Sequence, residues 1–175
     1  MNKKNIPLRI IMLDIDGVIS TEKSRYALDK EKVDLLGKII DATDAKIVIT
    51  SSWRMHTLEK TIEYLSTIDE YCVPFVFPYC DRIIGITIRA YHYVTQGIHL
   101  SIPRGVEIKQ WIDTNIHSDN GKNWSRKPLE EFNYVILDDD CDMLLEQKDN
   151  FVHTDSYLGL QDKDVELAIE ILNRK

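Results

Sequence analysis

The fold is indicated by residues 10–18, Ile10-Ile11-Met12-Leu13-Asp14-Ile15-Asp16-Gly17-Val18, in which an apolar run is followed by two aspartates and a glycine. Short apolar runs bounded by a turn residue are typical of strands buried in a parallel sheet. In an open α/β sheet, the carboxyl ends of the strands form the ligand crevice. We therefore expect Asp14 at this edge of the sheet and Asp16 just past it. Taken alone, the same residues also fit a hydrogen-bonded turn without chemistry.

Two further strand-like runs end in polar residues. Residues 46–49 precede Thr50 and Ser51, whose hydroxyls suit either a phosphate oxygen or the cap of the next helix. Residues 134–137 precede three successive aspartates at 138–140. Two like charges about 4 Å apart repel by roughly 4 kcal/mol at an effective dielectric constant of 20. A crowded acidic edge therefore predicts a bound cation, and Mg²⁺ prefers oxygen ligands of this kind.

Together these motifs resemble the haloacid dehalogenase (HAD) superfamily of Mg²⁺-dependent phosphohydrolases. The resemblance implies that Asp14 is the nucleophile and Asp16 the general acid and base. It also implies that the Thr50 hydroxyl holds the transferring phosphoryl group. The implied Mg²⁺ site combines Asp14 and the backbone carbonyl of Asp16 with Asp138 and Asp139, either of which could be the direct ligand.

The same resemblance implies a cationic side chain near the start of the helix that precedes the last acidic motif. Arg104 suits this position, and Lys109 is the alternative. A narrower resemblance, to the HAD domain of Swiss-army-knife RNA repair proteins, is carried by four segments: Ser51-Ser52-Trp53-Arg54, Arg104-Gly105-x-Glu107-Ile108-x-x-Trp111-Ile112, Ile136-Leu137-Asp138-Asp139-Asp140 and Thr154-Asp155-x-x-x-Gly159-Leu160.

The alternation of strands and helices predicts an α/β fold with a central parallel sheet and helices on both faces. The resemblance implies that this fold is a HAD-like, Rossmann-type three-layer sandwich, formed by residues 1–175 as one domain. Besides the first strand, we expect strands at 46–50, 83–87, 134–137 and 151–154. Helices are expected after Asp29, around 58–65, at 103–113 and near the end of the chain. Residues 18–30 and 90–102, where larger relatives carry a cap domain, are too short for a separate core. We therefore expect a capless enzyme, or one with a minimal cap, and an open site.

The composition argues against several classes of protein. With 22 basic and 29 acidic residues the net charge is −7, which does not favour a general polyanion-binding surface. The chain has no apolar run long enough to span a bilayer and no secretory signal pattern. Its three cysteines have no metal-ligand spacing. We expect a cytoplasmic protein without membrane contact, and nothing in the sequence indicates an obligate protein partner.

Substrate contacts are expected from Ser51, Arg54, Arg126 and Lys127, although the loop that holds the last two also fits a plain solvated loop. The expected activity is that of a phosphomonoesterase that works through an aspartyl phosphate. From the RNA repair resemblance, its substrate would be an RNA or DNA end or a nucleotide. Two alternatives stay open: a small-metabolite phosphatase, favoured by the acidic balance, and a catalytically silent HAD module that binds a phosphorylated ligand.

Overall fold

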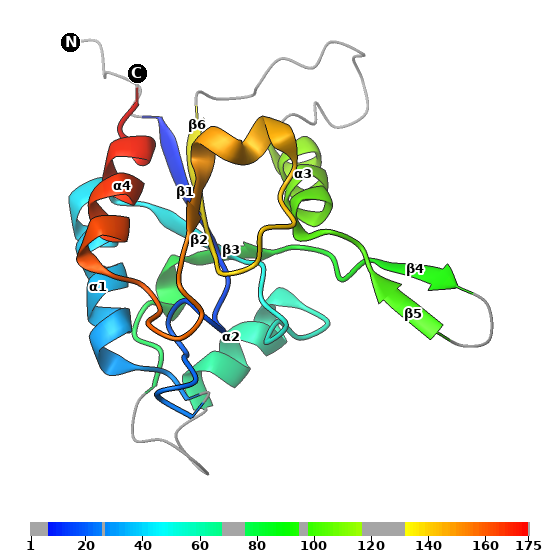
Figure 1. The fold of residues 1–175 in the computed structure, drawn as a ribbon, viewed down its shortest axis with the longest axis horizontal. Helices are drawn as coiled ribbons and strands as arrows, with labels where there is room; N and C mark the ends of the chain where they lie inside the picture. The colour runs from blue at the N-terminus through cyan, green and yellow to red at the C-terminus, as the bar shows by residue number, and fades with distance from the viewer. Residues whose placement is uncertain (1–6, 26, 68–75, 95–97, 117–131, 175) are drawn as a thin grey trace.

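The computed structural model describes residues 7–25, 27–67, 76–94, 98–116 and 132–174, and its core is a five-stranded sheet (Figure 1). The strand order is β3-β2-β1-β6-β7, and all neighbouring strands are parallel. The strands are β1 (Leu8–Leu13), β2 (Lys46–Ile49), β3 (Ile83–Ile86), β6 (Phe132–Asp138) and β7 (Phe151–His153). The predicted α/β fold with a central parallel sheet is confirmed.

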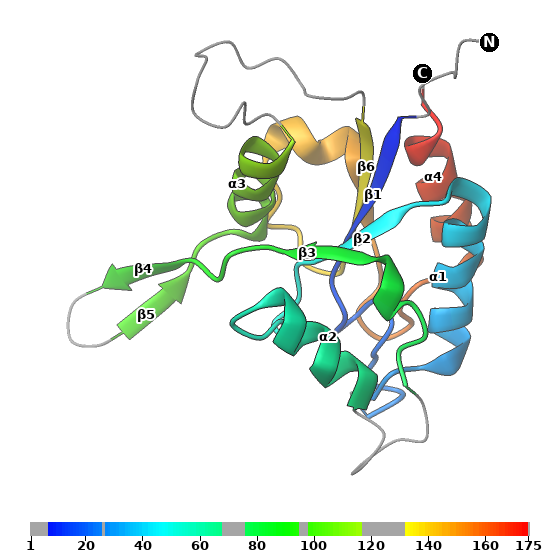
Figure 2. The ribbon, with the colours of Figure 1, turned by 180° about the vertical axis from the view of Figure 1, so that it is seen from behind.

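Helices cover both faces of this sheet, as Figures 1 and 2 show. Helices α1 (Lys30–Thr43), α2 (Leu58–Thr67) and α4 (Asp162–Leu172) contribute to the apolar cluster on one face, and α3 (Arg104–Asn115) to the cluster on the other. Side chains alternate between the faces along β1, so that Ile11 joins the first cluster and Met12 the second. Among the described residues, no helix is long and apolar enough to cross a membrane.

The predicted strands and helices in the described ranges are confirmed, with ends that shift by a few residues. Asp29 caps α1 by accepting a hydrogen bond from the backbone N–H of Glu31 at 2.9 Å. The antiparallel hairpin of β4 (Tyr91–Val94) and β5 (Ile98–Ser101) was not predicted, nor were the short 3₁₀ helices η2 (Cys80–Arg82) and η3 (Leu145–Asn150). The hairpin projects away from the sheet (Figure 1).

The topology fixes the position of the site. The chain runs from β1 outward to β2 and β3, and then crosses to β6 and β7 on the other side of β1. Because the direction of winding reverses beside β1, a crevice forms at the carboxyl ends of β1, β2 and β6. Asp14, Thr50 and Asp138 all lie at this edge of the sheet.

Candidate active site

Three carboxylates meet at the carboxyl ends of β1 and β6. Asp14, Asp138 and Asp139 each offer one oxygen, and these oxygens all lie within 4.8 Å of one another. Asp14 is buried, and its Oδ1 accepts a hydrogen bond from the backbone N–H of Ile15 at 2.7 Å. Asp138 is fully buried, and its Oδ1 accepts one from the backbone N–H of Asp140 at 3.0 Å. Oδ2 of Asp138 has no hydrogen-bond partner among the described residues.

Burial raises the pKa of all three carboxyls. The pKa of Asp138 rises to about 8 through burial and then through the nearby charge of Asp14. Burial also raises the pKa of Asp14, against the opposing charge of Arg104, and burial followed by the charge of Asp14 raises that of Asp139. The shared upward direction of these pKa shifts indicates that the protein compensates the three carboxylate charges poorly. The donor set therefore fits a hard divalent cation such as Mg²⁺, which binds carboxylate oxygens.

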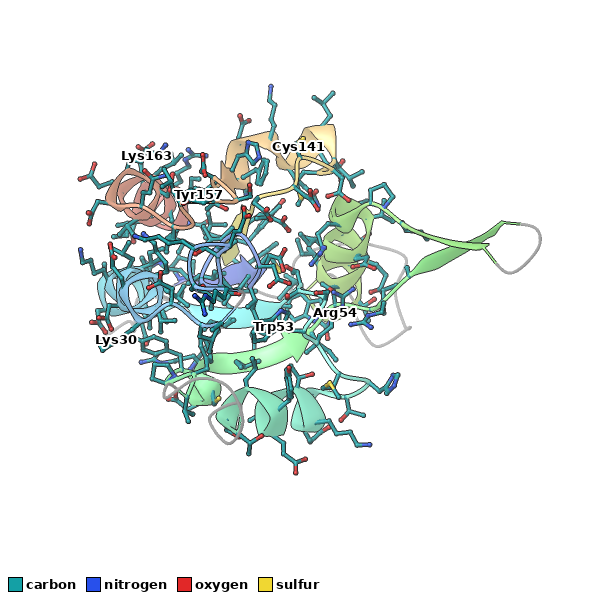
Figure 3. The ribbon with its side chains drawn as sticks, turned by 60° about the horizontal axis from the view of Figure 1, so that its bottom comes forward. Lys30, Trp53, Arg54, Cys141, Tyr157 and Lys163 are labelled. Carbon is teal, nitrogen blue, oxygen red and sulfur yellow. The ribbon has the colours of Figure 1, made fainter. Side chains whose placement is uncertain are left out.

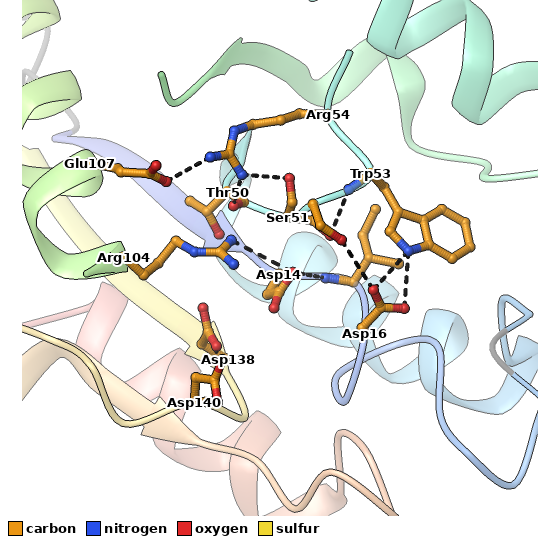
Figure 4. Close-up of polar contacts among 12 residues, drawn as sticks. Asp14, Asp16, Thr50, Ser51, Trp53, Arg54, Arg104, Glu107, Asp138 and Asp140 are labelled. Atoms are coloured by element: carbon orange, nitrogen blue, oxygen red, sulfur yellow. Dashed lines mark hydrogen bonds and ion pairs between the residues drawn. The ribbon is translucent and has the colours of Figure 1, made fainter. Parts of the chain in front are cut away.

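The guanidinium group of Arg104 lies near Asp14 and Asp138 (Figure 4). Nη1 of Arg104, at the start of α3, lies 3.8 Å from Oδ1 of Asp14. This Nη1 is buried and forms no hydrogen bond with any described residue. The backbone N–H of Arg104 donates to Oδ2 of Asp142 at 2.8 Å, which anchors the first turn of α3. Lys109, the alternative, is exposed and pairs with Asp113 at 3.3 Å instead.

Thr50 and Ser51 follow β2 and are both buried. The backbone N–H of Thr50 donates to the carbonyl of Leu13 at 2.9 Å, which brings Thr50 next to Asp14. Oγ1 of Thr50 has no hydrogen-bond partner within the described ranges. Burial raises the pKa of Asp14, and a hydrogen bond from the Ser51 side chain partly opposes this effect. Thr50 therefore offers an unused hydroxyl, whereas Ser51 supports the carboxylate.

Asp16 lies apart from the three clustered carboxylates and faces the loop after β2 (Figure 4). Nε1 of Trp53 donates to both of its carboxylate oxygens, at 3.0 and 2.9 Å. The hydroxyls of Ser52 and Ser20 add weaker hydrogen bonds at 3.3 and 3.4 Å. Three groups from two segments thus fix the orientation of a half-buried carboxylate beside the proposed nucleophile.

The loop after β1 requires a glycine at position 17. Gly17 has a φ of +68°, and a Cβ there would lie 2.1 Å from Cγ of Asp139. The turn after β7 holds this loop, since Oγ1 of Thr154 donates to the carbonyl of Gly17 at 2.9 Å. The backbone N–H of Leu160 donates to the carbonyl of Val18 at 2.8 Å. The turn after β7 therefore supports the backbone that directly follows Asp16.

Arg54, an expected substrate contact, is only 6% exposed. Its Nη1 donates to the backbone carbonyls of residues 50–51, and its Nη2 donates to the carbonyl of Ile88 at 2.9 Å and to Glu107 at 2.6 Å. Glu107 also accepts from the backbone N–H of Ala90 at 2.8 Å. We call Arg54, Glu107, Ile88 and Ala90 the arginine junction. Nη1 and Nη2 of Arg54 therefore join three segments, whereas Nε has no hydrogen-bond partner among the described residues, and the expected substrate contact stays a prediction.

Two other expected substrate contacts, Arg126 and Lys127, lie outside the described residues. Sequence reasoning assigned no role to Trp53 or Glu107, although both lie in the segments that carry the narrower resemblance. Glu107 could have been noticed as an acid on the apolar face of a helix, next to Ile108. For Trp53 the only signal was its place directly after the serines that follow β2.

Comparison with known families agrees with this geometry. Residues 10–165 match the family model described as the HAD domain in Swiss Army Knife RNA repair proteins. No curated protein and no solved structure matches the chain. The family match supports a phosphatase-like hydrolase function in general terms, and the acidic cluster is of the kind that could bind the Mg²⁺ that HAD domains generally use. The chain belongs to the family of HAD domains found in Swiss Army Knife RNA repair proteins.

Proposed function

We propose that this protein is a Mg²⁺-dependent phosphomonoesterase that works through an aspartyl phosphate on Asp14. The observation that carries the proposal is a set of three buried polar atoms without hydrogen-bond partners among the described residues: Oγ1 of Thr50, Nη1 of Arg104 and Oδ2 of Asp138. Buried polar groups in folded proteins are normally hydrogen-bonded, so such a set calls for an explanation. Two of the three atoms are donors suited to phosphoryl oxygens, and the third is an acceptor suited to a cation.

In the proposed reaction, a carboxylate oxygen of Asp14 attacks phosphorus while the bond from phosphorus to the ester oxygen breaks. Asp16 protonates the departing oxygen and later takes a proton from the water that hydrolyses the acyl phosphate. Trp53 supports both steps because its indole N–H holds the Asp16 carboxylate in one orientation. Thr50 and Arg104 hold the phosphoryl oxygens in line with the nucleophile.

The side chains of Asp14, Asp138 and Asp139, with the backbone carbonyl of Asp16, are the proposed Mg²⁺ ligands. When bound, the cation would supply positive charge that offsets both the phosphoryl oxygens and the crowded carboxylates. This assignment is supported by the closeness of the three carboxylates and by the raised pKa of Asp138, whose burial comes without a compensating partner for Oδ2.

For the substrate we propose a phosphorylated RNA or DNA end. The support is the description of the matching family, which names RNA repair proteins. The described part of the insertion between β3 and α3 is a small hairpin that projects away from the sheet, which suits a polymer end entering the site. A small-metabolite phosphatase is the second candidate, and the net charge of −7 favours it.

The test uses a generic aryl phosphate and rapid-quench labelling. The purified protein should hydrolyse p-nitrophenyl phosphate with Mg²⁺ and lose this activity in excess chelator. Asp16→Asn should accumulate labelled protein, because an aryl leaving group needs little protonation whereas hydrolysis of the intermediate needs a base. Unchanged turnover in chelator would exclude the metal role. Turnover with no acid-stable label in either protein would exclude the covalent intermediate.

A further inference from the structure

Two cavities lie next to each other beside the arginine junction, and three residues, Ser52, Arg54 and Arg89, line both of them. The smaller cavity has a volume of about 300 Å³, and Arg104 also lines it. The larger has a volume of about 600 Å³. Arg104, which faces Asp14, and Arg89 both line the smaller cavity, so this cavity lies between the candidate active site and the larger cavity.

Apolar side chains form much of the wall of the larger cavity, and two of its lining residues carry buried polar atoms without a hydrogen-bond partner in the described ranges. Ile86, Ile88 and Met55 line it together with Thr87. Oγ1 of Thr87, a residue only 2% exposed, and Nε of Arg54 have no hydrogen-bond partner among the described residues. Ligand pockets of a few hundred cubic ångströms typically have this mixture of apolar surface and a few polar groups. The cavity therefore suits a flat apolar group with polar edges, such as a nucleobase on its sugar.

Arg89 lies where the two cavities meet. Its Nη2 donates to the backbone carbonyls of Ser52 and Arg54, the latter at 3.0 Å. Nε and Nη1 have no partner within the part of the chain that the structure describes. Arg89 is exposed, and a guanidinium is the side chain best suited to bind a phosphate with two parallel hydrogen bonds. In Figure 3, the neighbouring Arg54 lies on the side of Trp53 that is nearer the hairpin.

We propose that the larger cavity binds the second nucleoside of an oligonucleotide end, and that Arg89 binds the phosphodiester between the first and second nucleosides. The terminal phosphate then lies at Arg104 and the first nucleoside in the smaller cavity. This inference rests on the proposed function, because it assigns the part of the substrate that does not react. It predicts that a dinucleotide with a terminal phosphate is a better substrate than the matching mononucleotide.

The experiment compares kcat/KM for five substrates: pTpT, TpTp, thymidine 5′-phosphate, thymidine 3′-phosphate and p-nitrophenyl phosphate. For one of the two ends, the dinucleotide should exceed its mononucleotide by about tenfold, and this advantage should shrink as salt rises. Ile88→Glu puts a carboxylate on the cavity wall and should remove the advantage, as should Arg89→Gln. The matched control is Leu167→Glu on α4, where the exposed fraction is 39% compared with 47% for Ile88. This control should keep the advantage.

The inference is overturned if neither dinucleotide exceeds its mononucleotide while p-nitrophenyl phosphate is hydrolysed. It is also overturned if a phosphotyrosine peptide is preferred to both dinucleotides. Failure of the proposed function gives a different result, namely no hydrolysis of any substrate. In that case fluorescence polarisation with labelled pTpT and TpTp decides the question, because Ile88→Glu should weaken binding at least tenfold and Leu167→Glu should not.

Discussion

The candidate active site and the arginine junction each contain an arginine that faces a buried carboxylate, but the two ion pairs differ in how completely hydrogen bonds satisfy them. In the junction, Nη2 of Arg54 lies 2.6 Å from Oε2 of Glu107, and further hydrogen bonds engage both side chains. In the candidate active site, Nη1 of Arg104 lies 3.8 Å from Oδ1 of Asp14 and has no hydrogen-bond partner among the described residues. The same pairing of an arginine with an acid thus supports the scaffold in one place and, in the proposed function, chemistry in the other.

This difference has an energetic meaning. A buried charge costs free energy unless hydrogen bonds and an opposite charge replace the lost water. The junction provides most of these replacements, although Nε of Arg54 has no partner among the described residues, so its ion pair can hold three segments together. The centre provides only part of them, which is why burial raises the pKa values of Asp14 and Asp138. We expect a substitution to reduce stability in the junction and to reduce activity in the centre.

The largest effect is expected from Asp14→Asn in the catalytic centre. An amide cannot form the acyl phosphate, so kcat/KM for p-nitrophenyl phosphate should fall by roughly 10⁴-fold or more. The melting temperature should stay the same or rise, because the change removes a carboxylate that repels Asp138. Asp34→Asn, on the exposed surface of α1, is the control and should change neither value. A rate close to that of the wild type would show that Asp14 is not the nucleophile.

The second effect concerns the junction. Glu107→Ala leaves the buried guanidinium of Arg54 without its counter-charge and should lower the free energy of unfolding by about 3–5 kcal/mol, measured with urea. Asp162→Ala breaks an exposed pair with Lys38, which has an N···O distance of 2.9 Å, and should cost much less.

The double replacement Arg54→Met with Glu107→Leu should recover part of the stability lost in Glu107→Ala, since it removes both charges. If Glu107→Ala were no more destabilising than Asp162→Ala, the junction would not have the structural role assigned to it.

A smaller effect is expected from a substitution of Trp53, which lies in the loop after β2 and contacts Asp16. Trp53→Phe removes the N–H that orients Asp16, and kcat for an alkyl phosphate should fall roughly tenfold. The loss for p-nitrophenyl phosphate should be smaller, because its leaving group needs little protonation. Trp111→Phe, on the buried face of α3, makes the same chemical change and should affect both substrates equally. Equal losses in Trp53→Phe would indicate that Trp53 only supports the fold.

The smallest effect is a dependence of stability on pH in the protein without metal. Asp138 has a folded-state pKa of about 8, raised from 3.8, so the folded state binds more protons than the unfolded state between these values. Stability should therefore fall by a few degrees in melting temperature as pH rises from about 5 to 8. Mg²⁺ should reverse the fall, and Asp138→Asn should flatten the curve. A curve of unchanged slope in Asp138→Asn would assign the dependence to other groups.

The parts of the molecule that the sequence could predict are those with local signals. Strands that end in Asp14, Thr50 and Asp138 have an apolar run followed by polar residues, and parallel topology brings such strand ends together. The structural role of Arg54 could not be predicted from such a local signal. Its main partner, Glu107, is 53 positions away along the chain and lies on a different element. Arg54 can be buried because Glu107 compensates its charge, and the local sequence around Arg54 does not show this partner.

The hairpin of β4 and β5 illustrates a second limit. Its strands have four residues each. An alternation of apolar and polar residues over so short a segment does not distinguish a strand from a polar loop that contains aromatic residues. Its base, in contrast, is fixed by Arg54 and Glu107 through Ile88 and Ala90. The sequence therefore predicts the size of this insertion better than its conformation.

The position of β1 in the middle of the sheet has a consequence for the order in which the protein folds during synthesis. β1 is the first strand to be made, yet its neighbour β6 begins at Phe132, and the turn that supports Gly17 follows β7. Contacts so distant in sequence form late, since the intervening chain must first be synthesised and ordered. A nascent chain that ends before residue 132 holds Asp14 but lacks Asp138, Asp139 and the supporting turn. Hydrolytic competence should therefore arise only when synthesis of the domain is nearly complete.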